Sequence, residues 1–537
     1  MSEMSPNENR YDVVVMGGAI SGASTALLLR RWHPQLRVLV IEKGTEFDWK
    51  VGESTVEISA YFLTRVLRLY DYLSRHQLPK QGFRYWFFNG QVKSLKDASE
   101  VGPTQLARTP SFQIDRAHLD EHVLTIAREA GAEVWRPAKV VSFQLKEETQ
   151  GDNVLVVEKD GQRRTVTTPW IVDASGRAAL IARKKEMLHP VEEHPTASIW
   201  ARFRNVKDLD GVEVWGVDPS SRHIREVVAS RRLATNHFVG YGYWIWFIPL
   251  RGGETSVGLV WDKRLVDPKG ANMEEKLRGF LDENPLTREM LEHAEICPDD
   301  IRMFGNLPYL VDQVSGDGWS LVGDAAGFLD PFYSPGLDQM AFSVSCTLDL
   351  IRKASAKPEP KAFAEELALH NKRYARFFRY FFDAIYKDKY HVMGDYDTMT
   401  TTFLMDTALY YLAAVVPVYR WSADRILVPP YYQDGSGIAF HPMRFYSRRL
   451  ISIAKRKKAL GIYGNHNAGR RPGIVGFSLR ASVWVMLGHG LVRWAKAELA
   501  NAWSYVVRPK RVDGMPVHAE KMEMAAPPPQ PVAGLSR

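Results

Sequence analysis

The turn at residues 17–22 has the residue types that a dinucleotide-binding loop requires. Its sequence is Gly-Gly-Ala-Ile-Ser-Gly, and an acidic residue, Glu42, follows the last glycine by 20 positions. Glycine lets the backbone approach a pyrophosphate, a following helix N-terminus stabilises the phosphate charge, and the acidic side chain can accept from a ribose. Ala19 replaces the middle glycine of the usual pattern, so we expect a slightly wider turn. The candidate cofactor-binding residues in this part of the chain are Gly17, Ala19, Gly22, Glu42 and Lys43.

A pair of tryptophans, Trp244 and Trp246, belongs to a segment that reads Trp-Ile-Trp-Phe-Ile-Pro. On an extended segment, side chains two positions apart point to the same face. Pro249 suits the end of an edge strand, because proline cannot donate to a ladder. Core packing is the simpler interpretation, since tryptophan is usually well buried and the chain contains 15 of them. The functional interpretation is a wall that keeps a substrate away from a bound cofactor.

The elements that must position these residues follow from the hydrophobic pattern. A strand over 11–16, a helix over 23–31 and a strand over 37–41 surround the glycine-rich turn, which predicts the β-α-β start of a doubly wound sheet. The other expected elements are a helix over 117–130, strand-rich sequence over 133–172 and 197–260, a strand over 319–322 and a helix over 336–353. The expected fold class is α/β: a Rossmann-like domain with an inserted mixed β-sheet substrate domain and a C-terminal helical region.

The length of 537 residues exceeds one compact core, so we expect several parts. Residues 10–370 form the expected cofactor-binding domain, with an interleaved substrate subdomain at about 50–115 and 190–310. Residues 371–512 form a basic helical region, and residues 513–537 are expected to be a disordered tail because of their composition.

The net charge of +8 is concentrated near the C-terminus. Between His441 and Val512 the chain has 15 Lys or Arg residues and one acid, Glu498. Such a region attracts an anionic partner, so an acidic acyl carrier protein and an anionic membrane surface are candidates beside a merely solvated basic face. Nucleic acid is not expected as a partner, because no nucleic-acid-binding signature accompanies the charge.

Composition also indicates the cellular compartment in which the protein is expected. Two cysteines allow neither a disulfide scaffold nor a cysteine-ligated metal cluster, so we expect a reducing compartment and no metal. The polar N-terminus lacks the apolar stretch of a signal peptide, and we expect no apolar run of 18 residues. The prediction is a cytoplasmic protein, with peripheral attachment to a membrane as an alternative.

Two further motifs identify the dinucleotide. The segments at 173–177 (Asp-Ala-Ser-Gly-Arg) and 323–327 (Gly-Asp-Ala-Ala-Gly) each follow an expected strand. They resemble the second and third flavin motifs of the aromatic-hydroxylase-like FAD family, in which the second Asp binds the ribityl chain. Arg116 resembles the arginine that this family places near the cofactor. The resemblance implies that FAD is bound, and that the residues near it include Arg116, Gly323, Asp324, Pro331 and Gly336.

With FAD in place, the segment Trp244–Pro249 resembles the hallmark of flavin-dependent halogenases. The segment at 51–55 (Val-Gly-Glu-Ser-Thr) resembles that family's segment near the flavin, which adds Glu53 to the cofactor-binding residues. The segment at 80–85 (Lys-Gln-Gly-Phe-Arg-Tyr) resembles the segment that carries the family's essential lysine, here Lys80.

The resemblance implies a flavin C4a-hydroperoxide that oxidises chloride or bromide, with Lys80 as the relay to the substrate. It implies an electron-rich aromatic substrate, such as a phenol, a pyrrole or an aryl polyene, which is either free or associated with a carrier or membrane. A separate flavin reductase is the expected source of reduced FAD.

The segment after the third flavin motif departs from the halogenase pattern. Ser334, Pro335 and Gly336 occupy the expected halide site, but Pro335 has no N–H to donate. Tyr333 stands where tryptophan-modifying members carry a catalytic glutamate, so that subclass is not expected. Asp338 adds a negative charge, which disfavours an anion if the side chain faces the flavin.

Two alternatives remain open. One is an FAD-dependent monooxygenase or reductase on the same scaffold that does not bind halide, and the segment at 243–249 also loosely resembles a strand of prenyl reductases. The other is a flavoprotein whose main role is to bind a membrane or a synthase complex.

Overall fold

The structure is a computed structural model, and it describes residues 9–216, 228–422, 427, 436–471, 473–474 and 482–506. The tail expected at 513–537 lies outside the described residues.

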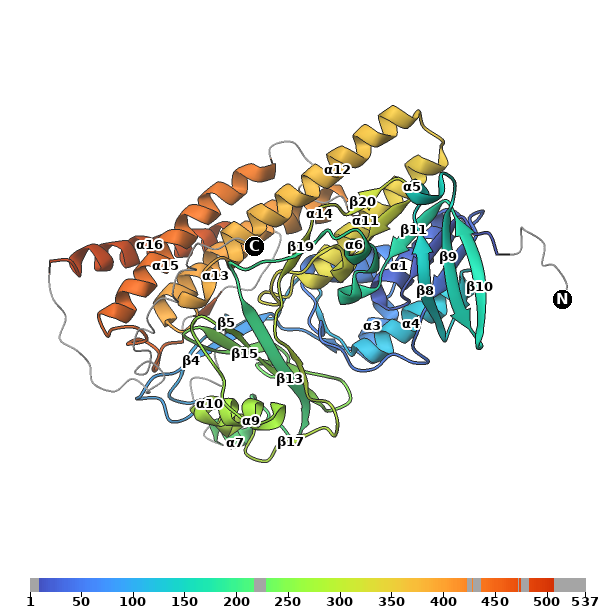
Figure 1. The fold of residues 1–537 in the computed structure, drawn as a ribbon. Helices are drawn as coiled ribbons and strands as arrows, with labels where there is room; N and C mark the ends of the chain where they lie inside the picture. The colour runs from blue at the N-terminus through green and yellow to red at the C-terminus, as the bar shows by residue number, and fades with distance from the viewer. Residues whose placement is uncertain are drawn as a thin grey trace, which may run out of the picture.

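A six-stranded sheet forms the N-terminal part of the protein, with the strand order β20-β21-β11-β1-β2-β7 (Figure 1). All neighbours run parallel except β20 and β21. The strands are β1 (Val13–Met16), β2 (Val38–Ile41), β7 (Glu133–Trp135), β11 (Trp170–Asp173), β20 (Ser315–Gly316) and β21 (Trp319–Leu321). The central strands consist almost wholly of buried apolar residues, as a parallel sheet covered on both faces requires.

Three helices connect and cover this sheet: α1 (Ile20–Trp32), α4 (Arg116–Glu129) and α11 (Gly336–Ser355). The expected Rossmann-like start is confirmed, although α1 begins three residues earlier than the apolar pattern indicated. The earlier start places the N-terminus of α1 within the glycine-rich turn. A separate three-stranded sheet of β8 (Ala138–Gln144), β9 (Asn153–Lys159) and β10 (Gln162–Thr168) lies beside it.

A nine-stranded mixed sheet forms a second layer (Figure 1). Its main strands are β4 (Phe83–Phe87), β5 (Ser99–Pro103), β13 (Thr196–Arg204), β14 (Thr235–Gly240), β15 (Tyr243–Pro249) and β16 (Thr255–Asp262). The parallel pair of β14 and β4 joins the two stretches that the sequence assigned to a substrate subdomain. The sheet also takes in β22 (Gly473–Ile474), far along the chain.

Pro249 is not at the end of an edge strand, which corrects the expectation from the sequence. Its strand, β15, lies between β14 and β16. The register of β14 on β15 ends at Asn236 opposite Phe247, so Pro249 extends past β14 and the missing N–H interrupts no hydrogen bond there.

The C-terminal part is helical and contains α12 (Pro360–Phe381), α13 (Tyr396–Tyr410), α14 (Val416–Trp421), α15 (Phe440–Ala459) and α16 (Ser482–Trp503). The domain boundary expected at residue 370 falls inside α12, so the helical region begins earlier than the change in composition. A π-helical turn, η6 (Tyr411–Val415), joins α13 to α14.

Among the described residues, the helical run Tyr396–Arg420 is long and apolar enough to cross a membrane by length and composition alone. The expectation that no such run exists was wrong. Threonines and Asp406 interrupt the apolar pattern of this helix, but its mean hydropathy is still 1.4. In the structure, 56% of the apolar window is buried inside the protein.

Candidate active site

The glycine-rich turn is closed so tightly that two of its glycines cannot be replaced. A Cβ atom on Gly17, whose φ is +107°, would lie 2.4 Å from the carbonyl oxygen of Ala174. A Cβ atom on Gly22 would lie 1.9 Å from the carbonyl oxygen of Gly17. The first turn of α1 has no acidic residue, and the N-cap residue Ala19 supplies no side-chain acceptor. Its backbone N–H groups are therefore available to a phosphate.

Glu42 holds this turn from the neighbouring strand. Its carboxylate accepts from the N–H of Gly18 at 2.7 Å and from the N–H of Gly44 at 2.9 Å. The carboxylate thus lies beside the turn, where the sequence places the ribose. Lys43 is exposed.

The third motif meets the first at the start of α1. Gly323 has a φ of +58°, and a Cβ atom there would lie 2.4 Å from Oγ of Ser21. The next residue, Asp324, is partly exposed, and desolvation raises the pKa of its carboxyl while Arg177 and Arg116 lower it. Arg116 is held in place by Asp120, with N–O distances of 2.9 and 3.0 Å.

Glu53 contributes an unsatisfied carboxylate oxygen. Its Oε1 accepts from Arg202 at 2.6 Å, whereas the buried Oε2 has no hydrogen-bond partner among the described residues. Burial raises the pKa of Glu53, and Arg202 and the nearby Ser256 lower it. A buried polar atom without a partner is costly unless a ligand satisfies it. This oxygen and the glycine cradles fit a bound dinucleotide such as FAD.

Lys80 is buried directly after β3 (Leu78–Pro79), and 3% of its surface is exposed. Its Nζ donates to Oγ of Ser54 and to the carbonyl oxygen of Thr55, both at 2.8 Å. The amine also lies 3.7 Å from the ring centroid of Phe83. Burial lowers the pKa of Lys80 to about 7, against the opposing effect of Glu57 and Asp338. The amine is therefore about half neutral at physiological pH.

A cavity of about 150 Å³ opens next to this amine. Lys80 and Phe83 line one side, and Tyr333, Pro335 and Asp338 line another. Helices of the C-terminal region close it with apolar side chains, among them Phe377, Phe381, Leu409, Phe440 and Met443. An apolar cavity of this size can hold one benzene ring.

Polar groups of the cavity wall come mostly from the C-terminal half, and of these the sequence analysis singled out Tyr333 and Asp338 but not Asp406, Tyr410 or Tyr411. Asp338 accepts from the N–H of Ser59 at 2.8 Å and from the hydroxyl of Tyr410 at 2.9 Å. Tyr333 donates to Asp406 at 3.0 Å, and Tyr411 donates to Glu57 at 2.6 Å. The only sequence signal for the residues that were missed is the cluster of tyrosines near Asp406.

Asp338 carries less negative charge than its type suggests. It belongs to the first turn of α11, and burial raises the pKa of its carboxyl to about 7 while Ser59 and Tyr410 lower it. The electrostatic repulsion between Asp338 and a neighbouring anion is therefore only partial at neutral pH.

The expected halide loop offers few donors. Tyr333 and Ser334 both have left-handed backbones, with φ of +69° and +55°. The N–H of Ser334 already donates to the carbonyl oxygen of Pro331 at 2.9 Å, and Pro335 is the N-cap of α11. Among the three expected residues, only Gly336 retains an N–H that could bind an anion.

Trp244 and Trp246 lie in the core, with ring centroids 5.7 Å apart. Their indole N–H groups donate to Tyr390 and Ser256, both at 3.1 Å. Trp244 packs against Phe332, with ring centroids 5.4 Å apart, and neither indole lines the Lys80 cavity. Through Trp244, the pair therefore packs against the loop before Tyr333. Its role as a wall between cofactor and substrate stays a prediction.

The buried amine predicts a pH-dependent stability. The pKa of Lys80 is about 7 in the folded state and about 10.5 in the unfolded state, so the unfolded chain binds more protons between these values. Burial of the amine lowers the free energy of unfolding at pH 7, and this loss is regained as the pH rises. Relative to Lys80→Met, the free energy of unfolding of the unmodified protein is expected to rise by about 3 kcal/mol between pH 7 and 9.5. Denaturant unfolding at both pH values measures this, and an unchanged difference would contradict a buried amine with a lowered pKa.

Comparisons with known proteins show the family to which the chain belongs. The family model described as tryptophan halogenase matches residues 90–399, more than half of the chain. A flavin-dependent halogenase of Dictyostelium discoideum, chlA, is 29% identical over 374 residues, which are 64% of this chain and 60% of the relative. A 1H-pyrrole-2-carbonyl-[peptidyl-carrier protein] chlorinase of Pseudomonas fluorescens is 26% identical over 350 residues, which are 62% of this chain and 73% of the relative.

The overall fold resembles solved structures over nearly its full length. The crystal structure of the halogenase PltM in complex with phloroglucinol and FAD matches with a TM-score of 0.68 and 16% identity. That match covers 91% of this chain and 98% of the other, and at this identity it shows the fold alone. By sequence, the chain spans about three fifths of the length of the first curated relative.

Proposed function

The chain belongs to the tryptophan halogenase family of flavin-dependent enzymes, and from this membership we propose that it halogenates a small electron-rich aromatic ring in the Lys80 cavity. The observation that carries the proposal is the amine of Lys80, which is buried yet lines a ring-sized cavity. The same cavity reaches Pro335 at the start of α11, beside the third flavin motif. FAD, when bound in its reduced form, supplies with dioxygen the oxidising equivalent that converts halide to an electrophile.

The residues of the chain then guide that electrophile. Ser54 and Thr55 each accept a hydrogen bond from Nζ of Lys80, which fixes the position of the amine. The lowered pKa supports two roles, because the neutral form can accept the halogen and the charged form can hydrogen-bond hypohalous acid. Asp338 and Glu57 line the same cavity and can accept the proton of a phenol or pyrrole, which raises the electron density of the ring.

The cavity size favours a phenol or a pyrrole over a larger substrate. The apolar lining accommodates one ring, and the carboxylates and tyrosines supply acceptors and donors for one or two polar substituents. Tyr333 stands where the family resemblance implies a catalytic glutamate in tryptophan-modifying members, which supports a substrate other than tryptophan. The same assay, with the ring supplied either free or attached to a carrier protein, tests which of the two forms is the substrate. A separate flavin reductase is proposed as the source of reduced FAD, since the described residues form a single dinucleotide-binding fold.

The direct test supplies reduced flavin, dioxygen and bromide or chloride with a panel of phenols and pyrroles, followed by mass spectrometry. A halogen mass shift that depends on the added halide is the expected result. Products that gain only oxygen would instead establish the alternative, a monooxygenase on this scaffold. That alternative has one observation in its favour, namely that neither Ser334 nor Pro335 offers a free N–H to a halide.

The proline at the halide loop predicts a gain of function. Pro335→Thr restores an N–H group, and threonine is also a favourable N-cap residue for α11. One hydrogen bond to an anion is worth about 1.5–3 kcal/mol, so the halide concentration for half-maximal rate should fall by about ten- to a hundredfold. Steady-state rates against bromide concentration measure the effect.

The control variant is Pro335→Ala, which restores the N–H without a capping hydroxyl. Both variants should lower the half-saturating halide concentration. Unchanged halide saturation in both would show that this backbone position does not face the halide.

A further inference from the structure

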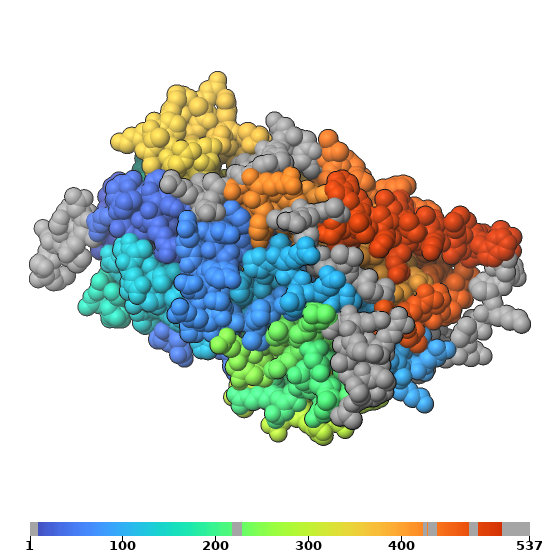
Figure 2. Space-filling view, turned by 180° about the vertical axis from the view of Figure 1, so that it is seen from behind, coloured from blue at the N-terminus to red at the C-terminus, as the bar shows by residue number. Residues whose placement is uncertain are grey.

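Helix α16 lies at the outer edge of the C-terminal region, where it forms part of the molecular surface (Figures 1 and 2). One face of this helix carries exposed apolar side chains. Trp484 is 63% exposed, Leu499 is 72% exposed and Trp503 is 66% exposed. Leu491 and Val492 lie between them and are about half exposed. On a helix these spacings place the five side chains along one side, which Lys496 and Glu498 border.

The opposite side of α16 is its packing face. Val483, Met486 and Gly490 are buried. A Cβ atom on Gly490 would lie 2.7 Å from Cγ of Met405, so α16 lies close against α13. The apolar face is therefore directed away from the protein core, and exposed surfaces of this kind usually bind a partner or a membrane.

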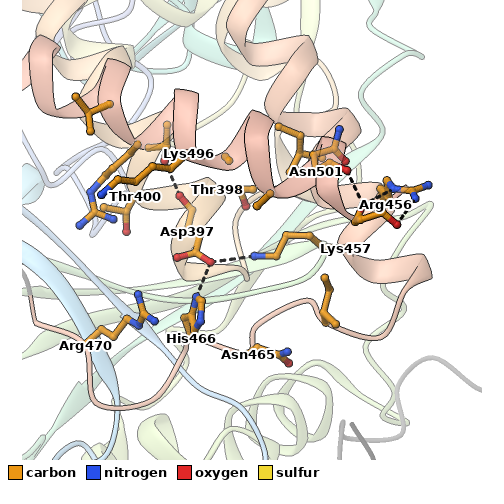
Figure 3. Close-up of a pocket in the computed structure, with 18 of the residues that line it drawn as sticks. Asp397, Thr398, Thr400, Arg456, Lys457, Asn465, His466, Arg470, Lys496 and Asn501 are labelled. Atoms are coloured by element: carbon orange, nitrogen blue, oxygen red, sulfur yellow. Dashed lines mark hydrogen bonds and ion pairs between the residues drawn. The ribbon is translucent and has the colours of Figure 1, made fainter. Parts of the chain in front are cut away.

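A groove of about 770 Å³ runs along α16 beside this face, between α13 and α15 (Figure 3). Lys457 and His466 converge on Asp397 at 3.1 and 2.7 Å, so the carboxylate of the groove is already paired. Besides Arg456, which donates to Ser504, three further cations line the groove without a carboxylate partner among the described residues: Arg470, Arg493 and Lys496.

The three cations are held close together. The guanidinium groups of Arg470 and Arg493 each lie 5.9 Å from the ring centroid of Tyr396. Lys496 lies one turn from Arg493 on α16 and is exposed. Helix α15, which also lines the groove, carries further basic residues, among them Arg448 and Lys455.

We propose that α16 docks on an anionic phospholipid membrane. The apolar face enters the boundary between headgroups and acyl chains, where exposed tryptophans are favourable, and the groove cations hold lipid phosphates. An exposed apolar stripe with a basic flank is the composition of an interfacial helix. An acidic carrier protein would satisfy the cations, but it would leave the two exposed indoles of α16 without an apolar environment.

The test is co-sedimentation of the full-length, FAD-loaded protein with vesicles of phosphatidylcholine alone or with 30% phosphatidylglycerol. The protein is expected to bind the anionic vesicles, and binding should weaken as salt increases. Each cation contributes about fivefold to partitioning, so Arg493→Glu with Lys496→Glu should reduce binding more than tenfold. Trp484→Ser with Trp503→Ser should also reduce it more than tenfold.

Matched controls come from α12, which has exposed residues of the same types. Leu369→Ser and Lys361→Glu should leave vesicle binding unchanged. Equal binding to neutral and anionic vesicles, or binding that survives both double variants, would overturn the proposal. Retention on an immobilised acyl carrier protein without binding to vesicles would also overturn it. Flavin absorbance and thermal unfolding confirm that each variant is folded.

Discussion

Replacing Lys80 by methionine is expected to reduce the formation of halogenated product by about 10²–10⁴-fold, the range for losing a group that transfers a reacting atom or proton. Methionine is similar in length and neutral, so the packing around Phe83 and the cavity volume change little. The variant should still bind FAD, because Lys80 lies outside the glycine-rich turn and the two later motifs. Product analysis by mass spectrometry and the flavin absorbance spectrum measure the two effects separately.

A second variant shows whether the effect belongs to the amine or to its surroundings. Ser54→Ala removes one of the two acceptors of Nζ but keeps the amine and the acceptor at Thr55. We expect an intermediate loss, smaller than that of Lys80→Met. Undiminished halogenation in Lys80→Met would show that the lysine is not the relay and would contradict the proposed mechanism.

Gly22→Ala is expected to lower FAD affinity by at least about a hundredfold. The added Cβ atom meets the carbonyl oxygen of Gly17 at 1.9 Å, so the turn and the N-terminus of α1 must move apart. A displaced turn loses hydrogen bonds to the pyrophosphate, and two such bonds at about 1.5 kcal/mol each correspond to this factor. Titration of the apoprotein with FAD, followed by flavin fluorescence, gives the affinity.

The matched control is Gly279→Ala in α9 (Met273–Glu283), where a Cβ atom meets nothing within 4 Å. That change should leave FAD affinity unchanged and stabilise the helix slightly, because alanine is the better helix former. Equal FAD affinity in Gly22→Ala and the unmodified protein would place the cofactor elsewhere.

The N-terminal half of the site could be predicted because its function depends on local sequence. A tight turn requires glycine at 17 and 22, and the strand, turn and helix around it follow one another in the chain. Glu42 is brought to the turn by a neighbouring parallel strand.

The C-terminal half of the site could not be predicted from the sequence. Asp406, Tyr410 and Phe440 reach the cavity only because α13 and α15 pack across the start of α11, and such long-range packing leaves no motif. The role of Pro249 was misjudged for the same reason. An isolated strand pattern does not reveal which neighbours pair with it, or where their pairing ends.

The cavity described above is encoded in two distant stretches of the gene. The residues proposed to deliver the halogen precede position 340, whereas most of the apolar surface of the cavity follows position 376. Selection for a new substrate can therefore alter α12, α13 and α15 without disturbing Lys80 or the glycine-rich turn. Chimeras that exchange these helices between relatives offer a route to altered ring preference with an unchanged oxidant.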